Sequence, residues 1–139
     1  MNCGAKELMK IQKIKPVFSD NRGDIYDIVS DPSIQHVSLF TINKGSIRGK
    51  HFHKKETQWL FILKGQVKVK IKNLLEKNSK VEEMVLEEKD LIFFPTYYYR
   101  ELIGISDSEC LFITSKSRKN NSHGEDTFAV SDIESFELS

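Results

Sequence analysis

Apolar positions along most of the chain recur every second residue or form short runs, and turn residues interrupt them about every 8–12 residues. This pattern is typical of a β-sandwich or a small β-barrel. The segment 66–72 shows it most clearly, because valine or isoleucine alternates with lysine, so one face is buried and the other solvated. Further strands are expected over 25–29, 37–42, 50–53, 58–63, 81–86, 91–94, 98–103 and 110–115.

The segment 58–63 departs from this alternation, because it is apolar on both faces. Leu60 and Ile62 share one side with Gln58, whereas Trp59, Phe61 and Leu63 share the other. A strand with water on one side does not carry such residues there, so something covers the second face. The cover is either the opposite sheet of the same domain, or a second subunit or swapped N-terminal arm. A homodimer is expected, because so small a domain has few elements left for a third layer.

Composition narrows the class of protein. The 139 residues suit one domain, with a core at about 20–115, an N-terminal arm at 1–15 and a tail at 116–139. Within the tail, 116–125 is polar and expected to be mobile, and 133–138 is expected to form a last helical turn or strand on the surface. The formal net charge of +1 argues against a nucleic-acid or membrane-surface binder, which needs a basic excess on one face. No membrane span or signal peptide is recognisable, and the two cysteines suit a reducing compartment, so a cytoplasmic location is expected.

Two histidines are framed by glycines in a spacing that points to a binding site. From Gly45 to Gly65 the chain reads G-x5-H-x-H-x4-Q-x6-G, with the histidines at His51 and His53 and the glutamine at Gln58. A two-residue step on a strand puts both imidazoles on one face. His36 and His123 lack such a frame and are interpreted as structural or surface residues. The connection 54–56 is expected to be exposed.

This spacing resembles the first motif of the cupin superfamily, G-x5-H-x-H-x3,4-E-x6-G, with Gln58 in place of the usual glutamate. Pro95 fits the second cupin motif, in which Arg100 stands where the family has a histidine. The resemblance implies an all-β, antiparallel double-stranded β-helix of the jelly-roll type. Two histidines, an amide and a guanidinium make a poor divalent-metal site, so neither a metal nor another cofactor is expected.

Within the cupins, the run from Arg48 to Lys54, followed by Gln58, is similar to the metal-free nucleotide-sugar enzymes. These are the dTDP-4-keto-6-deoxyglucose 3,4-ketoisomerases and, more distantly, the dTDP-4-dehydrorhamnose 3,5-epimerases. The resemblance implies that His51 is the base and that Arg48 helps to fix the substrate. His53 and Gln58 would shape the pocket. This sequence lacks the histidine usual at Arg100 and has Phe40 where a tyrosine stands on the preceding strand.

Arg100 and the adjacent tyrosines complete the predicted pocket. Arginine can hold a phosphate or a developing oxyanion, and a tyrosine can act as an acid. The alternative for Arg100 is that it only pairs with a carboxylate such as Glu101 or Glu56. Tyr99 is therefore a catalytic candidate with His51 and His53, and Tyr97 is a binding candidate with Arg48, Gln58 and Arg100. Alternation allows only one tyrosine set, either 97 and 99 or 98, to line the pocket.

Two functions stay open at this stage. The first is a metal-independent isomerase or epimerase that moves the proton beside the ketone of a dTDP-4-keto-6-deoxy sugar, for surface-polysaccharide synthesis. The second is a non-catalytic or metal-binding cupin that binds a sugar or small anion. Fold analogy does not separate them.

Overall fold

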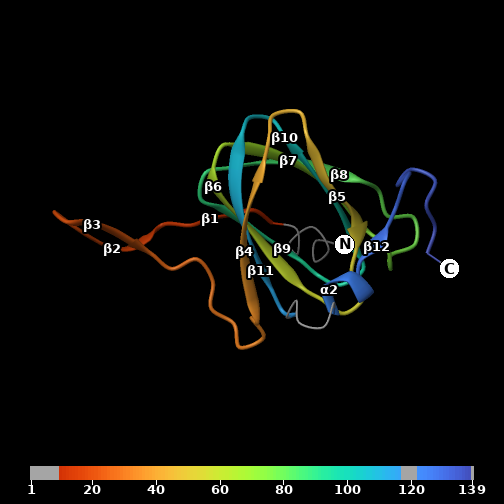
Figure 1. The fold of residues 1–139 in the computed structure, drawn as a ribbon, viewed down its shortest axis with the longest axis horizontal. Helices are drawn as coiled ribbons and strands as arrows, with labels where there is room; N and C mark the ends of the chain where they lie inside the picture. The colour runs from red at the N-terminus through yellow and green to blue at the C-terminus, as the bar shows by residue number, and fades with distance from the viewer. Residues whose placement is uncertain (1–9, 117–121, 139) are drawn as a thin grey trace.

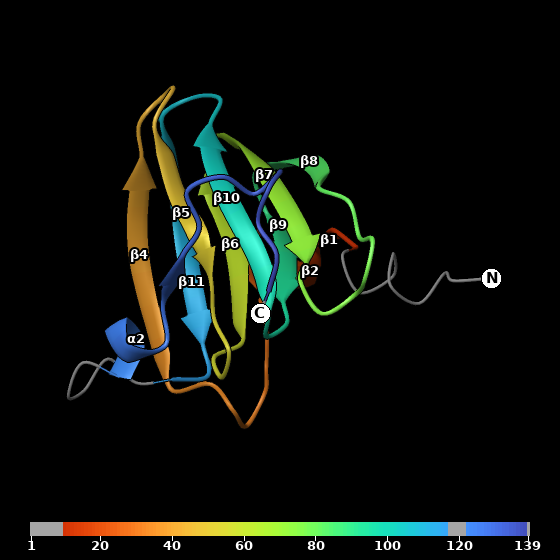
Figure 2. The same cartoon turned by 90° about the vertical axis from the view of Figure 1, so that its right-hand side faces the viewer.

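Two antiparallel sheets face each other and enclose the core (Figures 1 and 2). The computed structural model describes residues 10–116 and 122–138. In that part of the chain, no helix has the length and apolar character needed to cross a bilayer. The first sheet has the order β1-β9-β6-β11-β4 and the second β12-β5-β10-β7-β8. Their bounds are β1 Gln12–Lys13, β4 His36–Ile42, β5 Ile47–Phe52, β6 Gln58–Lys64, β7 Gln66–Asn73, β8 Glu82–Glu87, β9 Asp90–Phe94, β10 Tyr98–Gly104, β11 Ser108–Thr114 and β12 Phe128–Ala129.

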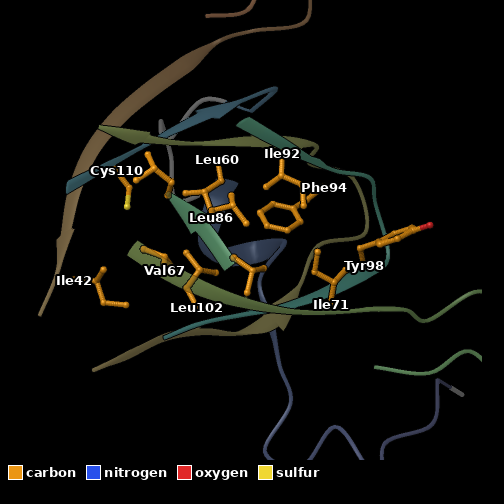
Figure 3. Packing of buried hydrophobic residues seen from close by; sticks show 12 residues of the cluster. Ile42, Leu60, Val67, Ile71, Leu86, Ile92, Phe94, Tyr98, Leu102 and Cys110 are labelled. Atoms are coloured by element: carbon orange, nitrogen blue, oxygen red, sulfur yellow. The ribbon is translucent and has the colours of Figure 1, made fainter. Parts of the chain in front are cut away.

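The core lies between the inner faces of the two sheets (Figure 3). On β7, Val67, Val69 and Ile71 are buried in it, as their alternation with lysine predicts. The lysines of this strand lie on the outer face, where Lys68 pairs with Glu83 on β8. Cys110 lies in the same core, and burial raises the pKa of its thiol to about 12. The other members are Ile42, Leu60, Ile62, Leu86, Ile92, Phe94, Tyr98 and Leu102.

The second apolar face of β6 is covered by this chain's own N-terminal segment and neighbouring strands. Phe61 is buried and Trp59 is half-buried in a cluster with Ile14 and Leu91. Residues of the segment between β3 and β4 pack on this cluster, namely Ile28 and Val29. Leu63, at the end of the row, remains 39% exposed. The cover is therefore not the opposite sheet, which packs on the other face of β6.

A two-stranded hairpin projects from the barrel, at the left of Figure 1. It consists of β2 (Pro16–Asp20) and β3 (Gly23–Tyr26), joined by a turn at Asn21 and Arg22. The expected strand at 25–29 is wrong in its bounds, since β3 ends at Tyr26. Every residue of the hairpin strands except Tyr26 is exposed, including Val17, Phe18 and Ile25.

The described part of the C-terminal tail packs on the barrel, and residues 122–125, in the stretch expected to be mobile, form a helix. Helix α2 (Ser122–Glu125) leads into β12, which pairs with β5. Beyond it, Val130 and Ile133 are buried against Phe52 on the outer face of the second sheet. The expected tail also includes 117–121 and 139, which lie outside the described residues. Residues 122–138 thus form a strap over one sheet, and this strap reaches the site.

Candidate functional site

The two framed histidines lie side by side at the end of β5, as predicted. Their ring centroids are 4.9 Å apart with an interplanar angle of 62°. His51 is half-buried, whereas His53 is completely buried. His51 is the cross-strand partner of Arg100 on β10, and such partners project from the same face of a sheet. His51 is therefore the imidazole that a molecule entering the barrel can reach.

A β-bulge in β5 sets which residues of this strand face inward. The register with β10 shifts between Arg100 and Glu101, and both Gly49 and Lys50 have positive φ, at 88° and 58°. A Cβ on Gly49 would lie 2.8 Å from the carbonyl oxygen of Arg100, so only glycine fits this close approach. The extra residue lets Arg48 and His51, three positions apart, share one side of the strand.

His53 is held by hydrogen bonding from the C-terminal strap. Its Nδ1 lies 2.7 Å from the carbonyl oxygen of Asp126. Because a carbonyl only accepts, this contact assigns the proton to Nδ1. The Nε2 atom lies 3.6 Å from Oε2 of Glu56, which is also completely buried. The second imidazole nitrogen therefore faces a carboxylate that can stabilise the charged ring.

Glu56 is a correction to the sequence analysis, which placed residues 54–56 in an exposed connection. Lys54 and Lys55 are exposed, but Glu56 turns inward and accepts a hydrogen bond of 2.5 Å from Nε2 of Gln58. Gln58 is buried as predicted, and its Oε1 accepts from Nη1 of Arg100 at 2.6 Å. A continuous buried chain of side chains thus joins Arg100 through Gln58 and Glu56 to His53.

Arg100 is a completely buried cation in the barrel. Its Nε donates to the carbonyl of Tyr98 at 3.1 Å, and its guanidinium carbon lies 4.6 Å from the ring centroid of Phe94. Among the described residues, Nη2 has no hydrogen-bond partner. Burial lowers the pKa of Arg100 to about 9, against the opposing effect of the negative charges on Glu56 and Asp126. The group remains positively charged at neutral pH and keeps a donor for an oxyanion.

The carboxylate of Asp126 binds the backbone of the turn between β5 and β6. Its Oδ1 accepts from the amides of Lys54 and Lys55 at 3.0 and 3.1 Å, and its Oδ2 from those of Lys55 and Glu56 at 3.1 and 2.8 Å. Burial acts to raise the pKa of Asp126, but these backbone hydrogen bonds outweigh it, so the pKa lies below its ordinary value. Asp126 is therefore ionised at neutral pH.

Arg48 lies nearer to solvent than the other predicted site residues. Its Nε donates to the carbonyl of Thr41 at 2.9 Å, and its guanidinium carbon lies 6.0 Å from the ring centroid of Phe40. A cavity of about 260 Å³ opens here, lined by Thr41, Ile42, Asn43, Ser46, Ile47 and Arg48. Arg48 is thus placed to contact a negatively charged group outside the barrel core.

The structure does not bring Tyr97 and Tyr99 to this site, which corrects their predicted place in the pocket. Both pack with Phe52 in the cluster beneath the strap, on the outer face of the second sheet. The hydroxyl of Tyr99 donates to Glu101 at 2.6 Å, and burial together with this hydrogen bond raises the pKa of Tyr99. Tyr98 lies in the core instead, because its strand position has the same parity as Arg100.

Similarity to known proteins places the chain in a family. Residues 18–128 match the model of the polysaccharide biosynthesis C-terminal domain. The chain belongs to this family. A curated relative, the UDP-2-acetamido-2,6-beta-L-arabino-hexul-4-ose reductase of Pseudomonas aeruginosa, is 32% identical over 60 residues. That match covers 43% of this chain and only 16% of the relative.

Solved structures show the same fold as this polysaccharide biosynthesis C-terminal domain. The 3,4-ketoisomerase QdtA of Thermoanaerobacterium thermosaccharolyticum, as a mutant in complex with TDP-4-keto-6-deoxyglucose, gives a TM-score of 0.68 at 21% identity and 88% coverage of both chains. The dTDP-4-dehydrorhamnose 3,5-epimerase of Bacillus anthracis, with TDP and PPi bound, gives 0.71 at 16% identity, covering 90% of this chain and 81% of that chain. The predicted cupin fold is confirmed.

Metal ligation finds no support in the side-chain arrangement of this domain. Over the described ranges, no group of three or more His, Cys, Asp or Glu side chains is placed to hold a metal ion. The two site histidines have the amide of Gln58 and the guanidinium of Arg100 as neighbours, and neither suits a divalent cation.

Sequence reasoning missed residues on three elements of this site. Glu56 and Asp126 carried no motif, and their burial depends on how the turn and strap pack. His36 was interpreted as structural or surface, yet it starts β4 as the cross-strand partner of Thr114, which also pairs with Gln58. Cross-strand partners share a face, so His36 lies in the inward-facing row. No sequence signal pointed to His36, because the outward-facing residues of β4 include the apolar Val37 and Leu39.

Proposed function

We propose that this chain is a metal-independent nucleotide-sugar isomerase or epimerase that transfers a proton beside the ketone of a dTDP-4-keto-6-deoxy sugar. The observation that carries the proposal is the pairing of the accessible His51 with the buried Arg100 on one inner face. A base and a fixed cation at adjacent positions suit removal of a proton and stabilisation of the negative oxygen that results.

Removal of the proton and stabilisation of the resulting oxyanion require only groups that this chain supplies. The imidazole of His51 takes the proton from C3 of the 4-keto sugar, and the electron pair left on carbon moves to the carbonyl oxygen to form an enediolate. Arg100 stabilises this oxyanion with its available Nη2 donor. Return of the proton to C4, with transfer of the C3 hydroxyl proton to the oxygen on C4, moves the ketone to C3. Delivery of a solvent proton to C3 from the opposite face inverts that centre.

The names of the relatives support the substrate class. The QdtA complex holds TDP-4-keto-6-deoxyglucose, and the curated relative is named for a UDP-linked keto sugar. The family name supports a role in making surface polysaccharide. Arg48, exposed beside a cavity, is the side chain that we assign to the pyrophosphate.

The proposed function is tested by incubating the protein with dTDP-4-keto-6-deoxyglucose in heavy water. We expect NMR to show deuterium at C3 of the sugar, or at C4 where the ketone has moved to C3. We also expect dTDP alone to raise the thermal unfolding midpoint, because it binds only the folded state. A buffer blank measures uncatalysed exchange. If dTDP stabilises the protein but no exchange occurs above the blank, the chain is a binder rather than an enzyme. Absence of both effects with dTDP- and UDP-linked sugars would exclude the substrate class.

The functional unit that we propose is a homodimer, with the β2–β3 hairpin as the contact. An isolated two-stranded hairpin is at best marginally stable, and here Val17, Phe18 and Ile25 are 60%, 50% and 55% exposed. Exposed apolar side chains gathered on one projecting element are typical of an interaction site. The described part of this chain places no other element over them.

Charged substitutions in this hairpin are expected to weaken the dimer. The double variant Phe18→Asp, Ile25→Asp places two negative charges at the contact. We expect its dimer dissociation constant to be at least about tenfold higher than that of the wild type. Leu75→Asp, at a 63% exposed residue of the 74–80 loop, is the matched control and keeps the dimer. Sedimentation equilibrium measures both. A monomeric wild type, or equal masses for all three proteins, contradicts this assignment.

A further inference from the structure

One carboxylate organises the turn that carries two of the buried site residues. The consecutive amides of Lys54, Lys55 and Glu56 all point at the Asp126 side chain, with N···O distances of 2.8–3.1 Å. Asp126 is only 4% exposed. Hydrogen bonds from backbone N–H groups to an ionised acceptor are stronger than neutral ones, so this contact fixes the backbone of the turn.

The same residue also orients the buried imidazole through its backbone. The carbonyl of Asp126 is 2.7 Å from Nδ1 of His53, and the Nε2 atom of that ring faces Glu56 at 3.6 Å. Asp126 therefore determines both the ring orientation and the place of the carboxylate opposite it. His53 in turn packs its ring against that of His51, the proposed base.

The strap places Asp126 here by contacts that its next residues make along β5. On its C-terminal side, the amide of Val130 donates to the carbonyl of Lys50 at 2.8 Å, and Ala129 is the cross-strand partner of His51. Phe128 stacks on Phe52 with ring centroids 5.4 Å apart. These contacts hold residues 128–130 along β5. Asp126 therefore lies at the turn because the residues that follow it are packed on the sheet.

We propose that Asp126 is a positioning residue for proton transfer, and that the C-terminal strap is for this reason part of the site. Asp126 acts through the turn at residues 54–56. It holds Glu56 and the Nδ1–H form of His53 in place behind His51. This inference rests on the proposed function for its kinetic consequence. Its structural content, which concerns the turn and the His53 ring, is independent of what the substrate is.

The test compares Asp126→Asn with Asp132→Asn, an exposed aspartate of the same strap that accepts hydrogen bonds only from Glu134 and Ser135 among the described contacts. The asparagine keeps one acceptor and loses the other. We expect faster amide hydrogen exchange at residues 54–56 and an altered ¹⁵N signal for the His53 ring in Asp126→Asn alone. In the deuterium-exchange assay we expect kcat to fall about 10²-fold with KM little changed, because a misplaced site loses rate rather than binding.

Unchanged exchange at 54–56 with an unchanged His53 ring signal overturns the inference, as does an effect on KM alone. If the wild type exchanges no deuterium, the proposed function has failed, and the NMR comparison alone decides the role of Asp126. If Asp126→Asn does not fold, the role of Asp126 is tested on the wild-type protein instead. Through-hydrogen-bond couplings from the amide nitrogens of 54–56 to the carboxylate carbon of Asp126 then support the inference, and their absence overturns it.

Discussion

Replacing His51 with alanine is expected to reduce the rate of deuterium exchange at C3 of the keto sugar by about 10²–10⁴-fold. The side chain is half-buried and faces the barrel, so its removal takes away the proposed base with little loss of packing. KM and the thermal unfolding midpoint are expected to change little. Steady-state exchange monitored by NMR gives both kinetic constants.

Lys50→Asn is the matched control for this substitution. Lys50 is exposed, precedes His51 on the same strand and has a φ of 58°, which asparagine tolerates better than most residues. We expect the control to retain wild-type exchange. Comparable exchange in His51→Ala and the control would remove His51 from its role, and the next candidate base would be His36 in the inward-facing row of the first sheet.

Replacing Arg100 with methionine is expected to lower the free energy of unfolding by about 3–5 kcal/mol, because it leaves the buried Glu56 without its nearby cation. The substitution also removes the donor to Gln58. Glu56→Gln alone removes the stronger of the two negative charges that act on Arg100 and is destabilising for the same reason. Urea unfolding of the two single variants and the double variant gives the coupling between the sites.

The double variant is the decisive member of this set. With both charges gone, we expect it to be more stable than the sum of the single effects predicts, by at least about 1 kcal/mol. Additive effects would contradict a coupled buried pair. Lys68→Met is the control, because Lys68 forms a solvent-exposed pair with Glu83 on the outer face of the second sheet, and such pairs contribute about 1 kcal/mol or less.

Much of the fold follows from sequence periodicity, whereas parts of the site follow from register. The alternation along 66–72 and the run at 58–63 predict β7 and β6 within one residue at each end. The bulge at Gly49 and Lys50 is different, because it depends on pairing with β10 and reverses the parity of β5. Spacing alone therefore gave no reason to put Arg48 and His51 on one side.

The tyrosines show what strand parity can and cannot decide. Once Arg100 is taken to face inward, alternation turns Tyr98 inward and Tyr99 outward, as the structure has them. The sequence could have given this result, and the choice of Tyr97 and Tyr99 was inconsistent with Arg100. No comparable rule exists for Glu56 and Asp126, since their burial arises from a contact across 70 positions of the chain.

The separation of the site residues along the chain has a consequence for biosynthesis. His53 and Asp126 are 73 positions apart, and Gln58 and Arg100 are 42 apart. Contacts between such distant residues close large loops and form late compared with local structure. A nascent chain still short of residue 126 would contain both histidines and most of the barrel strands but not the partner that orients His53. Assembly of a competent site must therefore await the emergence of Asp126 from the ribosome.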